Sequence, residues 1–122
     1  MKKLVFLMLI GFASVTVQAQ YAHTNWKGTI KGDAAQNAVF KFGKDTVVLY
    51  GADGAVIETM KYAIKAGVLS LTKISGQSDC DGSTTGKYKI ANTANSITIT
   101  VVTDACGDRS AALEATKWVK TK

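Results

Sequence analysis

Apolar and polar residues alternate at every second position along most of this chain. From residue 25 onward, short runs rich in Val, Ile, Thr, Tyr and Phe are separated by clusters of Gly, Asp, Asn and Ser. A period of two puts successive side chains on opposite faces of a β-strand, and no later segment sustains the longer period of a helix. The pattern predicts an all-β protein of about eight strands. The predicted strands are residues 25–31, 38–43, 46–50, 56–66, 68–75, 86–91, 96–103 and 115–120.

The connections between these runs are short and suit tight turns. Residues 43–45, 52–54, 66–67 and 92–95 contain Gly, Asp or Asn, which tolerate positive φ or hydrogen-bond their own backbone. Sequential strands should therefore pair as antiparallel neighbours. The sheet has one apolar face and the chain is too short to supply helices that cover it, so the sheet must close on itself. We predict a single small antiparallel up-and-down β-barrel.

Alternation assigns the large apolar side chains to the barrel interior and most lysines and threonines to its outer face. The predicted interior set is Trp26, Ile30, Phe40, Phe42, Val47, Leu49, Met60, Tyr62, Ile64, Leu69, Leu71, Tyr88, Ile90, Ile97, Ile99, Val101 and Trp118. Such residues line small-molecule pockets, but they also build ordinary packed cores, and both interpretations stay open. The candidate lining of a ligand cavity is Phe40, Phe42, Leu49, Glu58, Met60, Tyr62, Leu71, Tyr88 and Ile99.

One carboxylate interrupts the apolar interior face. Glu58 shares its face with Val56, Met60 and Tyr62, so alternation points it into the barrel. A buried charge needs a partner. The first alternative, which we favour, is that Glu58 sits in water near an open mouth of the barrel. The second is that it orients a polar group of a ligand.

The first residues have the character of an export signal. Lys2 and Lys3 precede an apolar run from Leu4 to Val17, and the small residue Ala19 follows. This order is typical of a signal peptide, and the apolar run is too short to span a bilayer. We expect a signal peptide at residues 1–19, a barrel domain at residues 20–122, and a periplasmic or secreted mature protein without a membrane anchor.

The two cysteines of the chain are Cys80 and Cys106. In an exported small domain, two thiols usually form a disulfide, which we predict here. Closing a loop of this length stabilises a fold by about 3 kcal/mol in the chain-entropy model.

The sequence offers little for catalysis or metal binding. His23 is the only histidine, so a serine or cysteine nucleophile has no convincing base. Asp79 with Asp81 and Asp104 with Asp108 flank the two cysteines, and a disulfide would bring these pairs together. They could hold calcium, but the further ligands of a recognised calcium loop are missing, so turn formation is favoured. We expect no enzyme activity, no metal and no cofactor.

The positive charge of the chain is spread along it. The formal net charge is +6, and the lysines are scattered as on the solvated outer faces of strands. The aromatic residues alternate inward and do not interleave with lysines on an exposed face, so we expect no nucleic-acid partner.

Two segments carry a family likeness. Residues 24–29 read TNWKGT, with Trp26 placed as in the first-strand signature of lipocalins and the wider calycin-like group. Residues 104–109 read DACGDR, with Trp118 downstream and Cys80 upstream. The chain thereby resembles small exported bacterial lipocalin-like domains. The resemblance implies that Arg109 lies over Trp26 and closes the barrel through a cation–π contact.

Two functions of different classes follow. The first is an exported, non-enzymatic binding protein that takes a small apolar ligand into the barrel. The second is a solid barrel that engages a protein partner through its end loops, for example as a hydrolase inhibitor. The segment 77–85, tied to Cys106, is the candidate inhibitory loop.

Overall fold

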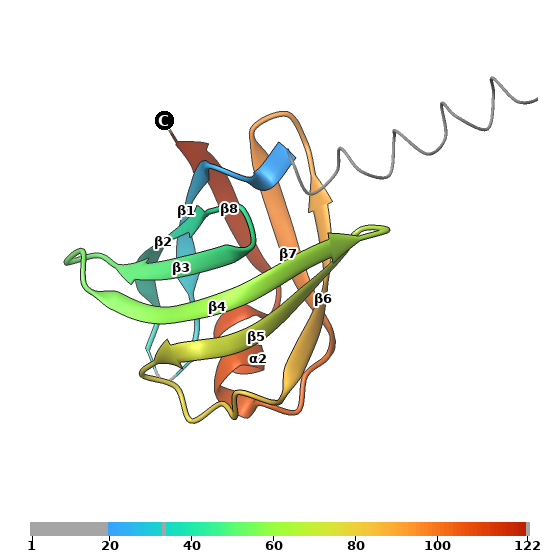
Figure 1. Ribbon diagram of the computed structural model, residues 1–122. Helices are drawn as coiled ribbons and strands as arrows, with labels where there is room; N and C mark the ends of the chain where they lie inside the picture. The colour runs from blue at the N-terminus through green and yellow to red at the C-terminus, as the bar shows by residue number, and fades with distance from the viewer. Residues whose placement is uncertain (1–19, 33, 122) are drawn as a thin grey trace, which may run out of the picture.

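A computed structural model gives the structure of residues 20–32 and 34–121 (Figure 1). The predicted signal peptide at residues 1–19 lies outside the described residues. No helix among the residues described is both long and apolar enough to cross a membrane.

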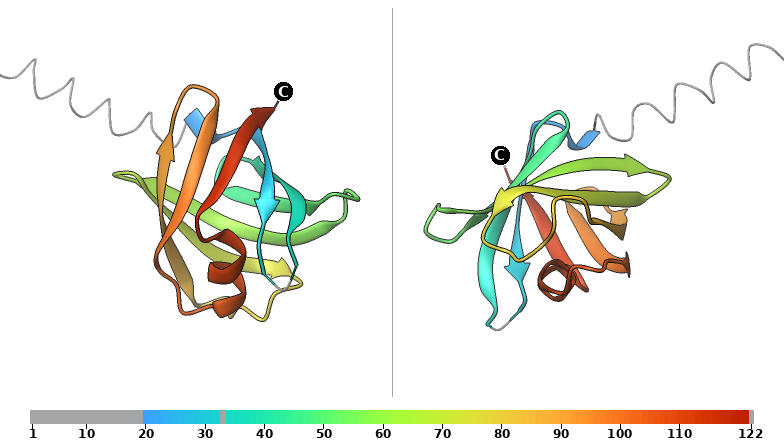
Figure 2. Two further views of the ribbon diagram at one scale, coloured as in Figure 1. Left: turned by 180° about the vertical axis from the view of Figure 1, so that it is seen from behind. Right: turned by 60° about the horizontal axis from the view of Figure 1, so that its bottom comes forward.

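The described chain forms a closed antiparallel barrel of eight strands in sequential order, with β1 paired to β8 (Figures 1 and 2). This confirms the predicted all-β barrel, and most predicted strand limits lie within one residue of the observed ones. The strands are β1 Thr24–Ile30, β2 Gln36–Phe42, β3 Thr46–Gly51, β4 Val56–Lys65, β5 Val68–Gly76, β6 Thr85–Asn92, β7 Ser96–Thr103 and β8 Thr116–Thr121.

Three register shifts help these short strands to curve into a barrel. They lie between Leu49 and Tyr50 in β3, between Thr59 and Met60 in β4, and at the start of β6. A bulge of this kind bends a strand and increases its twist. In Figure 1, β4 and β5 accordingly sweep across the whole front of the barrel.

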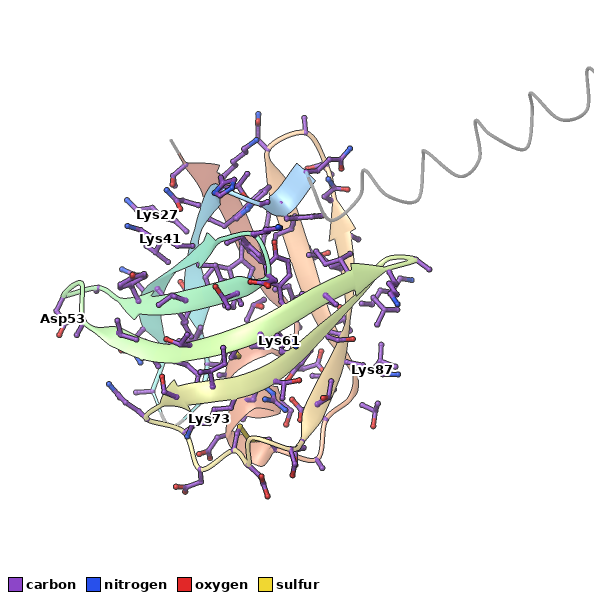
Figure 3. All side chains as sticks on the ribbon, in the orientation of Figure 1. Lys27, Lys41, Asp53, Lys61, Lys73 and Lys87 are labelled. Carbon is purple, nitrogen blue, oxygen red and sulfur yellow. A yellow bond between two sulfur atoms is a disulfide. The ribbon has the colours of Figure 1, made fainter. Side chains whose placement is uncertain are left out.

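Alternation sorts the two faces of the wall as predicted. Lys27, Lys41, Lys61 and Lys87 are exposed and lie on the outer side of the strands (Figure 3). Every predicted interior residue belongs to the buried core except Val101, which packs partly buried against it. The core also contains Tyr21, Ala38 and Leu113, which the alternation did not include.

Large aromatic side chains fill the middle of the barrel. The Phe40 and Trp118 rings lie 4.3 Å apart between centroids, and Phe42 meets Tyr62 edge-on at 5.0 Å. Trp118 and Tyr88 have no exposed surface. The centre of the barrel is therefore a packed core rather than a ligand chamber.

One helix was not predicted. Helix α2 spans Gly107–Leu113 and lies across the end of the barrel at which β1 finishes, where the Lys31 amide donates to the Ala112 carbonyl at 2.9 Å. Its seven residues make only two turns, too few for a helical period to stand out from the alternating pattern. The good helix formers in residues 110–114, SAALE, are the signal that could have revealed it.

Gly28→Ala should destabilise the barrel. The added Cβ would lie 2.6 Å from the Trp118 ring and 2.7 Å from the Lys117 carbonyl oxygen. Overpacking of this kind lowers the free energy of unfolding by about 1–3 kcal/mol, which urea denaturation can measure. Gly107→Ala is the control, because nothing lies within 4 Å of its added Cβ. Equal stability of the two variants would contradict the close packing of Trp118 on β1.

Candidate functional site

A cavity of about 520 Å³ opens at the end of the barrel beside α2. Its wall comes from the end of β1, the start of β2, parts of β3 and β4, the segment after β5, and α2; the right-hand view of Figure 2 brings this end forward. The apolar part of the wall consists of Ile30, Leu49, Ile57, Met60, Ala111, Ala112 and Leu113. The polar part consists of Gln36, Glu58, Gln77, Ser78, Asp108 and Arg109.

The structure divides the predicted ligand lining between the cavity and the packed core. Leu49, Glu58 and Met60 lie in the cavity wall. The other six predicted residues are buried in the core away from this wall: Phe40, Phe42, Tyr62, Leu71, Tyr88 and Ile99. Sequence reasoning missed the contributions of α2 and of residues 77–78, because both depend on how the loops return across the barrel end.

Glu58 contributes a carboxylate to one side of the cavity wall. It is only 4% exposed, so the expectation that it sits in water at an open mouth is wrong. Its Oε1 accepts a hydrogen bond from the Ser78 amide at 3.2 Å, and its Oε2 accepts one from the Ser78 hydroxyl. The Lys73 ammonium donates to the Ser78 carbonyl and so holds this segment in place. Among the described residues, no ion pair includes Glu58.

Gly76 makes room for this carboxylate. It pairs with Glu58 across β4 and β5 and has a φ of 142°. A Cβ at this position would lie 2.0 Å from Glu58 Oε1 and 2.7 Å from Glu58 Cα. The absence of a side chain at Gly76 is therefore what allows the Glu58 carboxylate to be seated in the wall.

Arg109 forms a buried ion pair behind the other side of the cavity. Its Nε lies 2.6 Å from Asp104 Oδ2, and its Nη2 donates to Asp104 Oδ1 at 2.9 Å and to the Thr84 carbonyl at 3.0 Å. The Tyr88 hydroxyl and the Cys106 amide also donate to the Asp104 carboxylate. Arg109 Nη1 has no partner, and it is the only such buried side-chain polar atom found in residues 20–32 and 34–121.

The pairing of Arg109 with Trp26 that the lipocalin resemblance implied is replaced by this ion pair. No cation–π contact between them occurs in the described part of the chain. The Trp26 indole donates to Thr24 Oγ1 at 2.9 Å, and its ring lies 6.2 Å from that of Tyr21, near the start of β1. Arg109 sits on α2, beside the opposite end of β1, which separates the two side chains.

The surroundings of the ion pair fix its protonation state. Burial disfavours the charge on Asp104, but hydrogen bonds from Arg109, Tyr88 and the Cys106 amide outweigh burial and lower the Asp104 pKa. Burial likewise opposes the charge on Arg109, yet the bonds to Asp104 raise the Arg109 pKa. Burial together with Asp104 raises the Tyr88 pKa far above its ordinary value. Asp104 is therefore anionic and Tyr88 neutral at neutral pH.

The predicted disulfide between Cys80 and Cys106 is confirmed, with a Cα–Cα distance of 5.3 Å. It ties the segment after β5 to the residue that precedes α2. The aspartates around it form local hydrogen bonds: Asp81 accepts from the Ser83 amide at 2.9 Å, and Asp108 accepts from the Asp79 amide at 2.9 Å. Within the described residues, no group of three or more His, Cys, Asp or Glu side chains is placed to hold a metal ion.

No protein-family model, no curated protein and no solved structure matches this chain. The barrel is compatible with a lipocalin-like fold.

Asp104→Asn should destabilise the protein by about 3–5 kcal/mol at neutral pH, because it leaves the buried Arg109 charge without its partner. The wild-type protein should also lose stability in acid. Since folding lowers the Asp104 pKa, the ionised carboxylate stabilises the native state above the unfolded pKa of about 3.9. This contribution disappears as the pH falls through the folded-state pKa.

Urea denaturation at neutral and acid pH measures both effects, and the variant should lose less stability in acid than the wild type does. Asp53→Asn, at an exposed turn, is the matched control and should change the free energy of unfolding by less than about 0.5 kcal/mol. A neutral-pH stability of Asp104→Asn equal to that of the control would count against the buried ion pair.

Replacing both cysteines by serine should lower the free energy of unfolding by about 3 kcal/mol, because the unfolded chain gains the freedom of the open loop. The closed loop has a sequence separation of 26 residues. Urea denaturation of the double variant measures the loss, and the wild-type protein under reducing conditions should show a similar one. An unchanged denaturation midpoint would refute this role of the disulfide.

Proposed function

We propose that this protein is an exported, non-enzymatic, lipocalin-like binding protein that takes a small apolar molecule into the cavity beside α2. The cavity itself carries the proposal. Its volume of about 520 Å³ falls in the range of small-molecule sites, roughly 300–1,000 Å³. The wall combines apolar side chains, which would contact the hydrocarbon part of a ligand, with polar groups of the kind that orient ligands in such sites.

The proposed site lies at the end of the barrel because the middle is full. Phe40, Phe42 and Trp118 occupy the centre, whereas α2 contributes the small side chains Ala111 and Ala112 to the wall. A bound molecule would rest on Leu49 and the other apolar wall residues with the packed core beneath it. Burial of its apolar surface would supply about 25 cal/mol per Å².

We also propose that the protein is exported and that it is not an enzyme. The disulfide is consistent with an oxidising compartment, which supports a periplasmic or secreted location. His23 lies just before β1, whereas α2 and the cavity lie beside the far end of β1. The chain's histidine is therefore remote from the proposed ligand, so it could not act as a base on that ligand.

The alternative of a protein-inhibiting end loop finds less support. The segment 77–85 is held against the barrel at several points. The Gln77 amide donates to a carbonyl of β4 at 2.9 Å, the Asp79 amide donates to α2, and the disulfide fixes Cys80. An inhibitory loop should instead protrude from its scaffold, so we keep ligand binding as the proposed function.

Ala112→Phe should weaken ligand binding by at least about tenfold, because the larger ring would occupy the cavity. The probe is N-phenylnaphthylamine, which becomes fluorescent in apolar surroundings. Titration of the purified wild-type protein should show saturable fluorescence that the variant largely loses. Ala91→Phe, at an exposed position on β6, is the control and should bind as the wild type does. No saturable binding to the wild type, or equal binding to both variants, would refute the proposed site.

A further inference from the structure

Acidic side chains gather at the end of the barrel that holds the cavity. In an up-and-down barrel the connections alternate between the two ends, so every second connection lies at the α2 end. These connections are residues 31–35, 52–55, 77–84 and 104–115. Among the described residues, their acidic side chains are Asp53, Asp79, Asp81, Asp104, Asp108 and Glu114.

Few positive charges balance these acids. Within the described part of the same connections, the basic side chains are Lys31 and Arg109. The turns at the opposite end carry Lys44 and Asp45, whose charges cancel. The α2 end is therefore acidic, although the formal net charge of the whole chain is +6.

Glu58 brings a carboxylate into the cavity itself. It lies near the start of β4, is 4% exposed and belongs to the cavity wall. Its oxygens accept from Ser78, a neutral residue, and no cation of the described chain forms an ion pair with it. The ammonium of Lys73 bonds to the Ser78 carbonyl instead. A buried charge is unfavourable without a countercharge, so a cationic group on a ligand would be stabilised here.

Asp108 adds a second carboxylate to the wall, at an exposed position in the first turn of α2. Its Oδ2 accepts from the Asp79 amide at 2.9 Å, and an amide carries no net charge. The remaining charged wall residue is Arg109, whose charge is matched by Asp104. The wall therefore has an excess of negative charge.

This charge distribution favours a cationic ligand over a neutral or an anionic one. Coulomb attraction acts over several ångströms and is stronger in a partly buried site than in bulk water, so an ammonium group need not touch either carboxylate. A concave site lined by one sign of charge also raises the local concentration of molecules of the opposite sign. A carboxylate ligand would be repelled, and a hydroxyl would gain no such attraction.

The wall suits a primary ammonium better than a quaternary one. Sites for quaternary ammonium groups use aromatic cages, and no aromatic side chain belongs to the described wall of this cavity. A primary ammonium has three donors, which can be met by the side-chain oxygens of Gln36, Gln77 and Ser78 in the wall.

We propose that the cavity selects an apolar molecule that carries a primary ammonium group, whose charge is balanced by the carboxylates of Glu58 and Asp108. The inference rests on the proposed function, because the apolar wall would hold the hydrocarbon part of the same ligand. Preference for amines over alcohols and acids is the distinguishing property of such a site.

The test compares three probes with the same hydrocarbon chain: decylamine, decanol and decanoate. Each displaces N-phenylnaphthylamine from the purified wild-type protein at neutral pH, below the concentration at which it forms micelles. Decylamine should bind at least about tenfold more tightly than decanol, and decanoate should bind most weakly. Equal or tighter binding of decanol or decanoate would overturn the inference.

Variants of the two carboxylates test where the preference arises. Glu58→Gln removes one negative charge at nearly constant shape, so the preference for decylamine over decanol should shrink by about tenfold. Asp108→Asn makes the same change at an exposed position and should shrink it by about threefold. Asp45→Asn, exposed in a turn at the opposite end of the barrel, is the control and should leave the preference unchanged.

Binding of N-phenylnaphthylamine by Glu58→Gln shows that the cavity is still formed in this variant. If the variant does not fold, Asp108→Asn carries the comparison with the control. A preference that neither carboxylate variant alters would overturn the role given to these two residues.

The two proposals fail in different ways. Displacement of N-phenylnaphthylamine by decanol or decanoate at least as effectively as by decylamine would overturn the amine inference and leave the proposed function standing. Absence of saturable binding of the fluorescent probe to the wild-type protein would overturn both together.

Discussion

The buried ion pair between Arg109 and Asp104 organises the whole α2 end of the barrel. Asp104 follows β7 and also accepts from Tyr88 in β6, while Arg109 lies on α2 and reaches the Thr84 carbonyl. One pair of opposite charges thus joins two strands, a loop and the helix. Because a buried charge without its partner is strongly unfavourable, these four parts must take up their positions together.

The packed barrel centre and helix α2 are the two boundaries that define the cavity. Aromatic rings fill the barrel centre, and α2 crosses the end. The Lys31 amide just after β1 bonds to Ala112, and the disulfide fixes Cys106 just before the helix. Gly76 lets Glu58 sit in the wall between them. The cavity thus lies between the packed core and helix α2. For the proposed ligand, walls that are already held in place by these contacts would reduce the entropy lost on binding.

The parts that could be predicted from the sequence are those that follow from local periodicity. Alternation placed Phe40, Trp118 and Leu71 in the interior, since the side-chain direction in a strand depends only on position along it. It could not place Ser78 beside Glu58, because that contact arises where a loop folds back over the barrel. It could not place Asp104 beside Arg109, because that contact depends on the unpredicted helix α2. The same limit explains why alternation alone does not reveal that Glu58 is buried, whereas the pairing of Arg109 with Trp26 follows only from the lipocalin resemblance.

The closure of β1 onto β8 also restricts how another protein can bind. Along the paired stretches of the barrel, the backbone amides and carbonyls that an open sheet would present at its edges are used within the chain. A partner cannot add its own strand to a sheet without a free edge. Recognition of this barrel by another macromolecule must therefore depend on side chains and loop ends, where the outward-facing lysines are the most numerous charged groups.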